Sequence, residues 1–295
     1  MQHDGLEIYG NECVRYHGNK KTVRLPEGIT SIADSAFYFS GQLERLILPE
    51  GVRRIGRHAF AECFRLQTAV LPDTLEVIGE SAFENCRALE EIFLPPQTAY
   101  VGKMAFAKCS SLKTARLSDS LEVLRHGLFL GDVNLREIHL PKQLARIEDS
   151  VFYYCRSLEE IMVPEQVADI YPNTFYECNS LKRGYIPGIR LQFYRKQEQL
   201  TFVMLYLANR QAYCSGEQQM YEAYIRDFKP EVCERIAETS NYEALDGFMQ
   251  LNCLTQQELE RWMEQVRKKG NVEFTARLLR EKAEHFPAAR DIWEI

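Results

Sequence analysis

Residues 43–65 read LERLILPEGVRRIGRHAFAECFR and residues 66–88 read LQTAVLPDTLEVIGESAFENCRA, so one 23-residue pattern follows directly on another. Phenylalanine marks this period at positions that lie 23 residues apart: Phe37, Phe60, Phe83, Phe106, Phe129, Phe152 and Phe175. Self-similarity at a fixed period of roughly 20–50 residues is the sequence signature of a solenoid or a related repeat architecture. The sequence therefore predicts stacked coils rather than one globular core.

The shared unit reads L-x-x-I-x-L-P-x-x-V-x-x-I-x-x-x-A-F-x-x-C-x-x. Its first residues, such as 66–71, predict a short strand, and the proline after them marks a corner because proline cannot donate to a strand ladder. The Ala-Phe pair follows on a tight return segment. One coil alone would leave its apolar face in water, so stability has to come from neighbouring coils that stack on it.

These residues resemble the BspA-like, Treponema-type leucine-rich-repeat family, whose unit has the same Leu-Pro corner, Ala-Phe pair and cysteine. The resemblance covers about residues 23–187 and implies a right-handed parallel solenoid that is used for recognition, usually in bacterial or protist proteins. Few positions depart from the unit: Asp132 and Ser40 replace cysteine, Gly184 replaces an aliphatic residue, and Leu128, Val151 and Thr174 replace alanine.

The predicted fold is α+β, with three parts. Residues 1–22 contain alternating apolar residues on both sides of Gly10-Asn11, which predicts a β-hairpin cap. Residues 23–187 form the solenoid of about seven 23-residue coils, with a parallel sheet on its concave face. Residues 188–295 form an all-helical domain, with apolar faces at helical spacing in six stretches: residues 197–209, 217–228, 231–239, 242–251, 256–269 and 272–285.

Two segments of the helical domain repeat after 30 residues, beginning at Ser240 and at Gly270. This offset favours two helical hairpins similar to ankyrin or HEAT-type units, although the T-P-L-H ankyrin signature does not occur in the sequence. The simplest role for this domain is a C-terminal cap on the last coil.

Composition restricts the partners. Lys+Arg 36 against Asp+Glu 42 gives a net charge of −6, which argues against a nucleic-acid-binding surface. The first residues do not read as a signal peptide, and the longest apolar run is far too short to span a membrane. Nine cysteines without a C-x-x-C pair suggest reduced thiols, so we expect a bacterial cytoplasmic protein that binds neither nucleic acid nor membrane.

No motif in the sequence predicts catalysis or a cofactor. A G-x-S-x-G nucleophile elbow, a P-loop and a dinucleotide-binding glycine pattern are all missing from it. One cysteine per coil at a constant phase could form a disulfide ladder or a thiolate metal site, but a small buried residue in each repeat explains the column more simply. We therefore expect a protein that is not an enzyme and that holds no metal.

The candidate binding site is the fifth position of each unit, where side chains of a strand point away from the inward leucines. Apolar residues rimmed by charge at these positions are typical of a recognition surface, although such residues also simply suit strands. The hypothesis assigns seven of these residues to contact with an unidentified protein partner: Ile47, Val70, Phe93, Arg116, His139, Met162 and Tyr185.

Two alternatives remain open. The chain could be a surface or secreted adhesin whose export signal is absent from this sequence. It could also carry an enzyme or ligand-binding domain in residues 197–285, with the repeats as a targeting arm. That second alternative requires polar side chains gathered on the inner helix faces, where the sequence has mainly leucine, phenylalanine, tyrosine and methionine.

Overall fold

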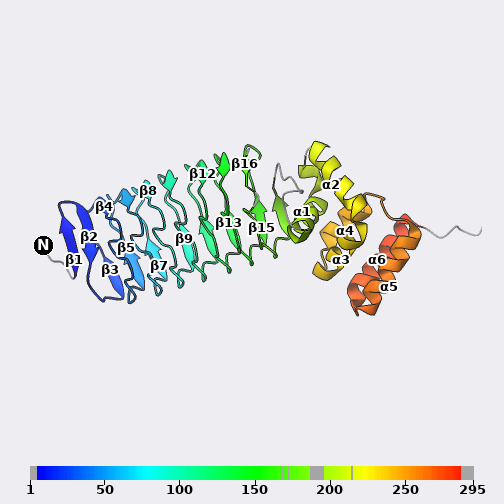
Figure 1. Ribbon diagram of the computed structural model, residues 1–295, viewed down its shortest axis with the longest axis horizontal. Coiled ribbons are helices and arrows are strands. Elements are labelled where there is room, and N and C mark those ends of the chain that lie inside the picture. Colours follow the sequence, from blue (N-terminus) through cyan, green and yellow to red (C-terminus); the bar gives the residue numbers. More distant parts are fainter. Residues whose placement is uncertain (1–4, 168, 172, 187–195, 214, 287–295) are drawn as a thin grey trace, which may run out of the picture. The chain divides into compact units, whose positions relative to one another are not determined.

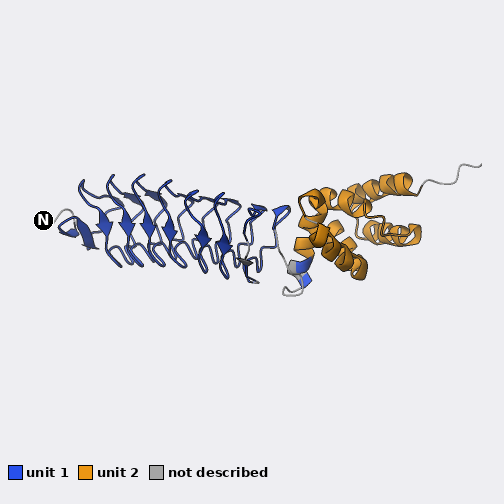
Figure 2. Ribbon diagram, turned by 90° about the horizontal axis from the view of Figure 1, so that it is seen from above, with its two compact units in different colours: residues 1–199 blue, residues 200–295 orange. Residues whose placement is uncertain are grey.

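The computed structural model describes residues 5–167, 169–171, 173–186, 196–213 and 215–286. The chain divides into two compact units, Met1–Gln199 and Leu200–Ile295 (Figure 2). The boundary predicted between residues 187 and 188 lies outside the described residues. Within them, no helix is both long and apolar enough to cross a membrane.

The first unit begins with the predicted β-hairpin. Strands β1 (Leu6–Tyr9) and β2 (Glu12–Tyr16) pair antiparallel around a two-residue turn, in which Gly10 has a φ of 58°. The ring of Tyr16 stacks on Phe37 at 5.0 Å between centroids. Strand β2 also pairs in parallel with β4 of the first coil, so the hairpin covers that coil as predicted.

Each coil then contributes a three-residue strand and a two-residue strand, and the coils stack one after another (Figure 1). The longer strands are β3 (Thr22–Arg24), β5 (Arg45–Ile47), β7 (Thr68–Val70), β9 (Glu91–Phe93), β11 (Thr114–Arg116), β13 (Glu137–His139), β15 (Glu160–Met162) and β17 (Arg183–Tyr185). The shorter strands are β4 (Ser31–Ile32), β6 (Arg54–Ile55), β8 (Val77–Ile78), β10 (Tyr100–Val101), β12 (Val123–Leu124), β14 (Arg146–Ile147) and β16 (Asp169–Ile170).

The pairing confirms the 23-residue period and adds a second strand column. Longer strands pair in parallel with a shift of one unit, so that Thr114 lies opposite Glu137. The shorter strands also pair in parallel, as Ile55 does with Ile78, on the return segment that the sequence predicts as a tight connection. The aliphatic column of the repeat unit therefore forms strands of its own.

The core of the solenoid is a ladder of stacked phenylalanines. Centroid distances run from 4.9 Å for Phe37 and Phe60 to 6.0 Å for Phe129 and Phe152. The cysteines of the repeat are buried beside this ladder, which agrees with their predicted role in packing. Because each ring contacts the rings before and after it, neighbouring coils stabilise one another.

The second unit is helical, and all six predicted helices are present. They are α1 (Lys196–Ala208), α2 (Ser215–Asp227), α3 (Lys229–Thr239), α4 (Tyr242–Met249), α5 (Gln256–Lys268) and α6 (Val272–His285), with a 3-10 turn at Arg210–Ala212. Helix α5 begins with the predicted capping box of Thr255 and Glu258. Asn241 caps α4 and Asn271 caps α6. The side chain of each accepts the backbone N–H of the residue three positions later, at 2.9 and 3.0 Å respectively. The 30-residue offset thus marks two similar helix starts.

Candidate functional site

The fifth-position side chains lie on the face of the longer strands, which we call the long-strand face. The fourth and sixth positions of most coils, such as Leu46 and Leu48, are buried, although Ala69, Leu71 and Leu140 are half-buried, while the third and fifth point outward. Phe93 is 51% exposed, Met162 53% and Val70 40%. Arg116 and His139 are exposed as well, whereas Ile47 and Tyr185 are half-buried.

Strand pairing gathers these residues into three groups rather than one continuous row. The hydrogen-bonded sheets of this face are β3-β5-β7, β9-β11-β13 and β15-β17. Ile47 therefore pairs with Val70. Phe93, Arg116 and His139 form the middle row, and Met162 pairs with Tyr185.

The middle group lines an open groove of about 720 Å³ at the proline corners. Phe93, Arg116 and His139 form one side, and Pro95 and Pro96 belong to the corner next to them. The charged residues Asp73, Asp119 and Lys142 also line this groove. The groove therefore presents an aromatic ring and a guanidinium group to a partner. Its carboxylates and its ammonium group can form polar contacts around them.

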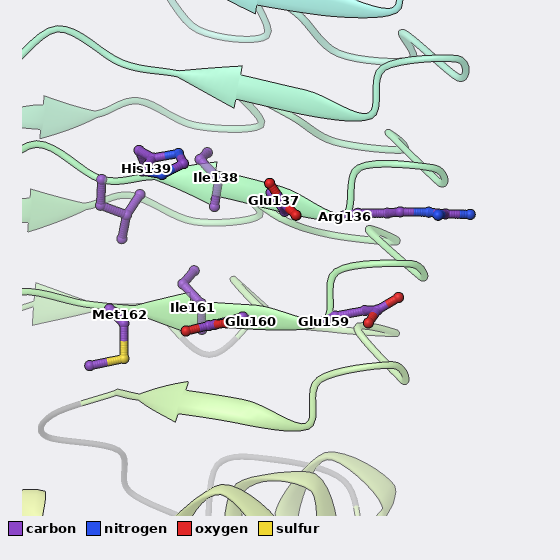
Figure 3. Close-up of a pocket in the computed structure, with 9 residues that line it drawn as sticks. Arg136, Glu137, Ile138, His139, Glu159, Glu160, Ile161 and Met162 are labelled. Carbon is purple, nitrogen blue, oxygen red and sulfur yellow. The ribbon is translucent and has the colours of Figure 1, made fainter.

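A second groove of about 540 Å³ lies along β13 and β15 (Figure 3). Its outward side chains are Glu137 and His139 from one strand and Glu160 and Met162 from the next (Figure 3). Two carboxylates beside a thioether suit a partner that brings hydrogen-bond donors or a positive charge together with an apolar side chain.

The described side chains of the two grooves do not assemble a nucleophile with its base. Ser118, the hydroxyl residue among those that line them, is 2% exposed, and its Oγ donates to the carbonyl oxygen of Pro96 at 2.8 Å. That hydroxyl is used to hold a corner.

The helical unit contains polar groups of the kind that the enzyme alternative requires, and two of those that line its groove form ion pairs. A groove of about 350 Å³ is lined by Arg210, Glu243 and Asp246 among others. Arg210 contacts Glu222 at 3.1 Å, and the carboxylate of Asp246 accepts from Arg277 at 2.6 Å. These ion pairs connect helices, so a structural role accounts for them.

One trio in the described residues has the spacing of cation ligands. Glu281, Glu284 and His285 each place a possible ligand atom within 4.8 Å of the others. However, the guanidinium of Arg277 contacts Oε1 of Glu281 at 3.0 Å. A positive charge therefore already balances this carboxylate, and we assign the trio to helix packing.

An exposed aromatic cluster, which we call the aromatic corner, was missed by the sequence interpretation. It consists of Tyr38, Phe39, Phe64 and Arg87, where Phe39 meets Phe64 edge-on at 5.6 Å and Arg87 lies 5.1 Å from the Phe64 ring. Phe39 is 61% exposed with a φ of 60°, at a turn where most other coils carry a charged residue, Asn85 or glycine and where one other coil carries an aromatic residue, Tyr154. An aromatic residue in that turn column is the signal that could have revealed the cluster.

A parallel solenoid with leucine strands, proline corners and a phenylalanine ladder defines a leucine-rich-repeat protein. The profile of the BspA type leucine rich repeat region matches residues 7–136 and 105–193, with six copies, and the chain belongs to this family. This result agrees with the resemblance drawn from the repeat unit.

Solved leucine-rich-repeat structures from bacteria are similar in part. A protein from Bacteroides ovatus is 28% identical, covering 56% of this chain and 49% of its own, with a TM-score of 0.46. The T. pallidum leucine-rich-repeat protein is 31% identical over 50% of this chain and 82% of its own, with a TM-score of 0.44. A leucine-rich cell surface protein from Faecalibacterium prausnitzii is 25% identical over 59% and 61%, with a TM-score of 0.41. The chain thus spans about half the length of the B. ovatus protein. No curated protein matches it.

Proposed function

We propose that this chain is a non-catalytic protein-binding module that presents its long-strand face to a protein partner, with Phe93 as the anchor. The observation that supports this proposal best is the exposure of Phe93, which leaves 51% of the residue in contact with water at the edge of a groove. Aromatic side chains and arginine are the residues that most often dominate binding at interfaces.

The neighbours of Phe93 favour the same surface. Arg116 pairs with it in register, and His139 follows in the next coil. A partner that covers the ring would exclude water from these two side chains and strengthen polar contacts with them. The charged corner residues of the groove would then form the polar rim.

We place the protein in the bacterial cytoplasm, because its cysteines are numerous and odd in number, and five of the nine are buried in the repeat core. A surface or secreted adhesin is the alternative location for the same binding function. Fractionation of the native host, with this protein detected by antibody, separates the two. Recovery with the envelope or the medium would contradict the cytoplasmic assignment without affecting the binding surface.

The test of the binding surface compares three forms of the full chain as bait in the native host lysate. These are the unmodified protein, the Phe93→Asp variant and a Phe39→Asp variant of the aromatic corner. We expect at least one protein that is retained by the first and third baits and lost from the second, as measured by quantitative mass spectrometry. Loss from Phe39→Asp alone would move the contact surface to the aromatic corner.

A further inference from the structure

The cysteines of the repeat share one hydrogen-bonding pattern, which defines what a residue in this column must do. In five coils the thiol donates to the carbonyl oxygen of a phenylalanine 26 residues earlier, at 3.0–3.3 Å. These pairs are Cys63 with Phe37, Cys86 with Phe60, Cys109 with Phe83, Cys155 with Phe129 and Cys178 with Phe152. From the other side, a backbone group of the preceding coil hydrogen-bonds to the sulfur, as that of Cys63 does to Cys86. The column therefore requires a group that donates and accepts at once, which a thiol does.

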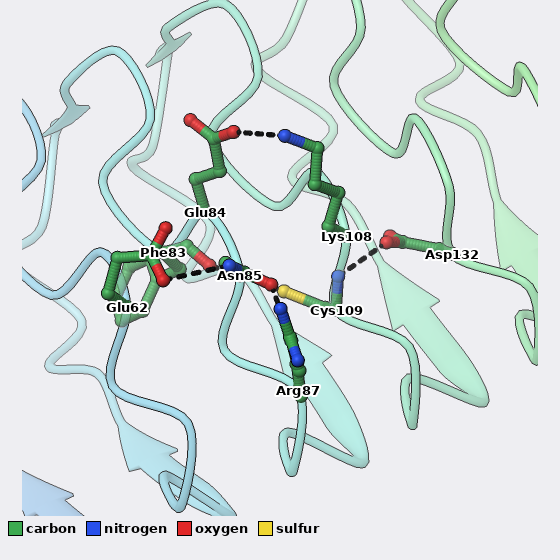
Figure 4. A network of polar contacts seen from close by, with 8 residues as sticks. All are labelled: Glu62, Phe83, Glu84, Asn85, Arg87, Lys108, Cys109 and Asp132. Carbon is green, nitrogen blue, oxygen red and sulfur yellow. Dashed lines mark hydrogen bonds and ion pairs between the residues drawn. The ribbon is translucent and has the colours of Figure 1, made fainter. Parts of the chain in front are cut away.

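Asp132 occupies this column in the coil between Cys109 and Cys155, and it meets only half of the requirement as an acceptor. It is fully buried, and its Oδ1 accepts the backbone N–H of Cys109 at 2.8 Å (Figure 4). The other oxygen, Oδ2, is buried without a hydrogen-bond partner among the described atoms. In the other coils the carbonyl oxygen that accepts from this column belongs to the phenylalanine 26 residues earlier, and for Asp132 that residue is Phe106.

We propose that Asp132 is a neutral carboxylic acid in the folded protein, and that its Oδ2–H donates to the carbonyl oxygen of Phe106. A carboxylate can only accept, so in the charged form neither the column position nor the unpartnered oxygen would be satisfied. A buried, unpaired charge is costly, whereas a protonated acid reproduces the donor and acceptor of the cysteine that it replaces.

The surroundings of Asp132 favour the neutral form. Burial raises the pKa of its carboxyl well above the usual range, and the hydrogen bond from Cys109 lowers it by less. The titratable groups that face it are the thiols of Cys109 and Cys155 in the adjacent coils, and burial raises the pKa of both thiols too. The ammonium group of Lys108, the residue before Cys109, pairs with Glu84 at 2.9 Å (Figure 4).

The proposal makes the solenoid sensitive to pH in a defined direction. An aspartate in an unfolded chain has a pKa of about 3.9, so at neutral pH folding must take up one proton at Asp132. The contribution of Asp132 to stability is complete below the pKa of the unfolded chain, and it declines as pH rises from there towards the pKa of the folded protein. Over this window the equilibrium constant for unfolding increases about tenfold per pH unit relative to a variant that cannot titrate.

The test uses the full chain and two matched variants. Asp132→Asn keeps one acceptor and one donor but cannot ionise, and Asp132→Cys restores the residue of the other coils. Hydrogen–deuterium exchange of peptides within residues 106–135, followed by mass spectrometry at pH 6 and pH 8, reports the opening of these coils. We expect the protection of each variant relative to the unmodified protein to increase between the two pH values, by at most about 100-fold, the limit set by tenfold per pH unit. A ratio independent of pH would overturn the proposal, and peptides of residues 256–285 provide the control.

A second measurement remains informative if neither variant folds. Infrared spectroscopy of the unmodified protein, labelled with ¹³C at aspartate carboxyls, should show one protonated carboxylic acid at pH 7. The label excludes glutamates, including Glu281, whose pKa is also raised by burial. The band should disappear when the protein is unfolded in urea at pH 7. Absence of a protonated aspartate in the folded protein would refute the neutral form of Asp132.

Discussion

Replacement of Phe93 by aspartate should weaken partner binding without unfolding the solenoid. An aromatic side chain buries about 150–250 Å² when fully covered, so covering the exposed half removes about 100 Å² from water. At about 25 cal/mol per Å² this burial is worth about 2–3 kcal/mol, which corresponds to a loss in affinity of at least roughly 30-fold. The introduced carboxylate adds a desolvation cost in the same direction.

The assay for this prediction is a titration of the captured partner by biolayer interferometry, with thermal unfolding of each variant measured in parallel by circular dichroism. The melting curve should change little because the ring points away from the core. Phe39→Asp is the matched control, since it removes a phenylalanine of the aromatic corner that is also more than half exposed. A Val70→Asp, Phe93→Asp double variant that melts normally and binds with unchanged affinity would refute the role of the long-strand face.

Three further predictions concern the scaffold. Phe106→Ala removes a ring that lies between two stacked neighbours. It should lower the free energy of unfolding, measured in urea, by about 3–5 kcal/mol, and by more than Leu6→Ala in the terminal hairpin does. Equal losses would argue against stacking of neighbours as the source of stability. Thiol titration of protein denatured without reductant should count nine free thiols, and a reproducible count of seven would mean a native disulfide. Lys229 and the cap of Thr255 lower the pKa of Glu258 to about 2, so its stabilising effect is present above pH 4.5 and is lost between pH 4.5 and 2. Glu258→Gln should flatten that acid limb of unfolding followed by Trp262 fluorescence, and an unchanged limb would exclude this carboxylate as its cause.

The repeat could be predicted from sequence because each coil solves the same packing problem with the same residues. Phe60 and Phe83 contact one another through equivalent positions, so the period of the sequence is the period of the structure. The second strand column was not predicted because two-residue strands such as Val77–Ile78 are too short to show an alternating pattern. Helix starts at Asn241 and Asn271 could be placed because their caps act within three residues.

The candidate site was predictable only as a column of outward side chains. The sequence identifies which residues alternate with the buried leucines, and Phe93 is exposed as that pattern requires. It cannot show that the face divides into three hydrogen-bonded groups, because that division depends on the fit of neighbouring coils. Asp132 is visible in the sequence as a departure from cysteine. Its unpartnered oxygen becomes visible only when the coils are stacked.

The parallel register between coils, with Thr114 opposite Glu137, makes the length of this protein adjustable in whole steps. Duplication of one 23-residue unit within the gene would add a rung and move everything beyond it by about 4.8 Å, while every existing pair keeps its partner. Insertion of a single residue into a strand would instead turn inward side chains outward. Descendants of such a gene can therefore change the length of the long-strand face by changing the number of coils. They can also exchange the residues of one coil while the other coils stay the same.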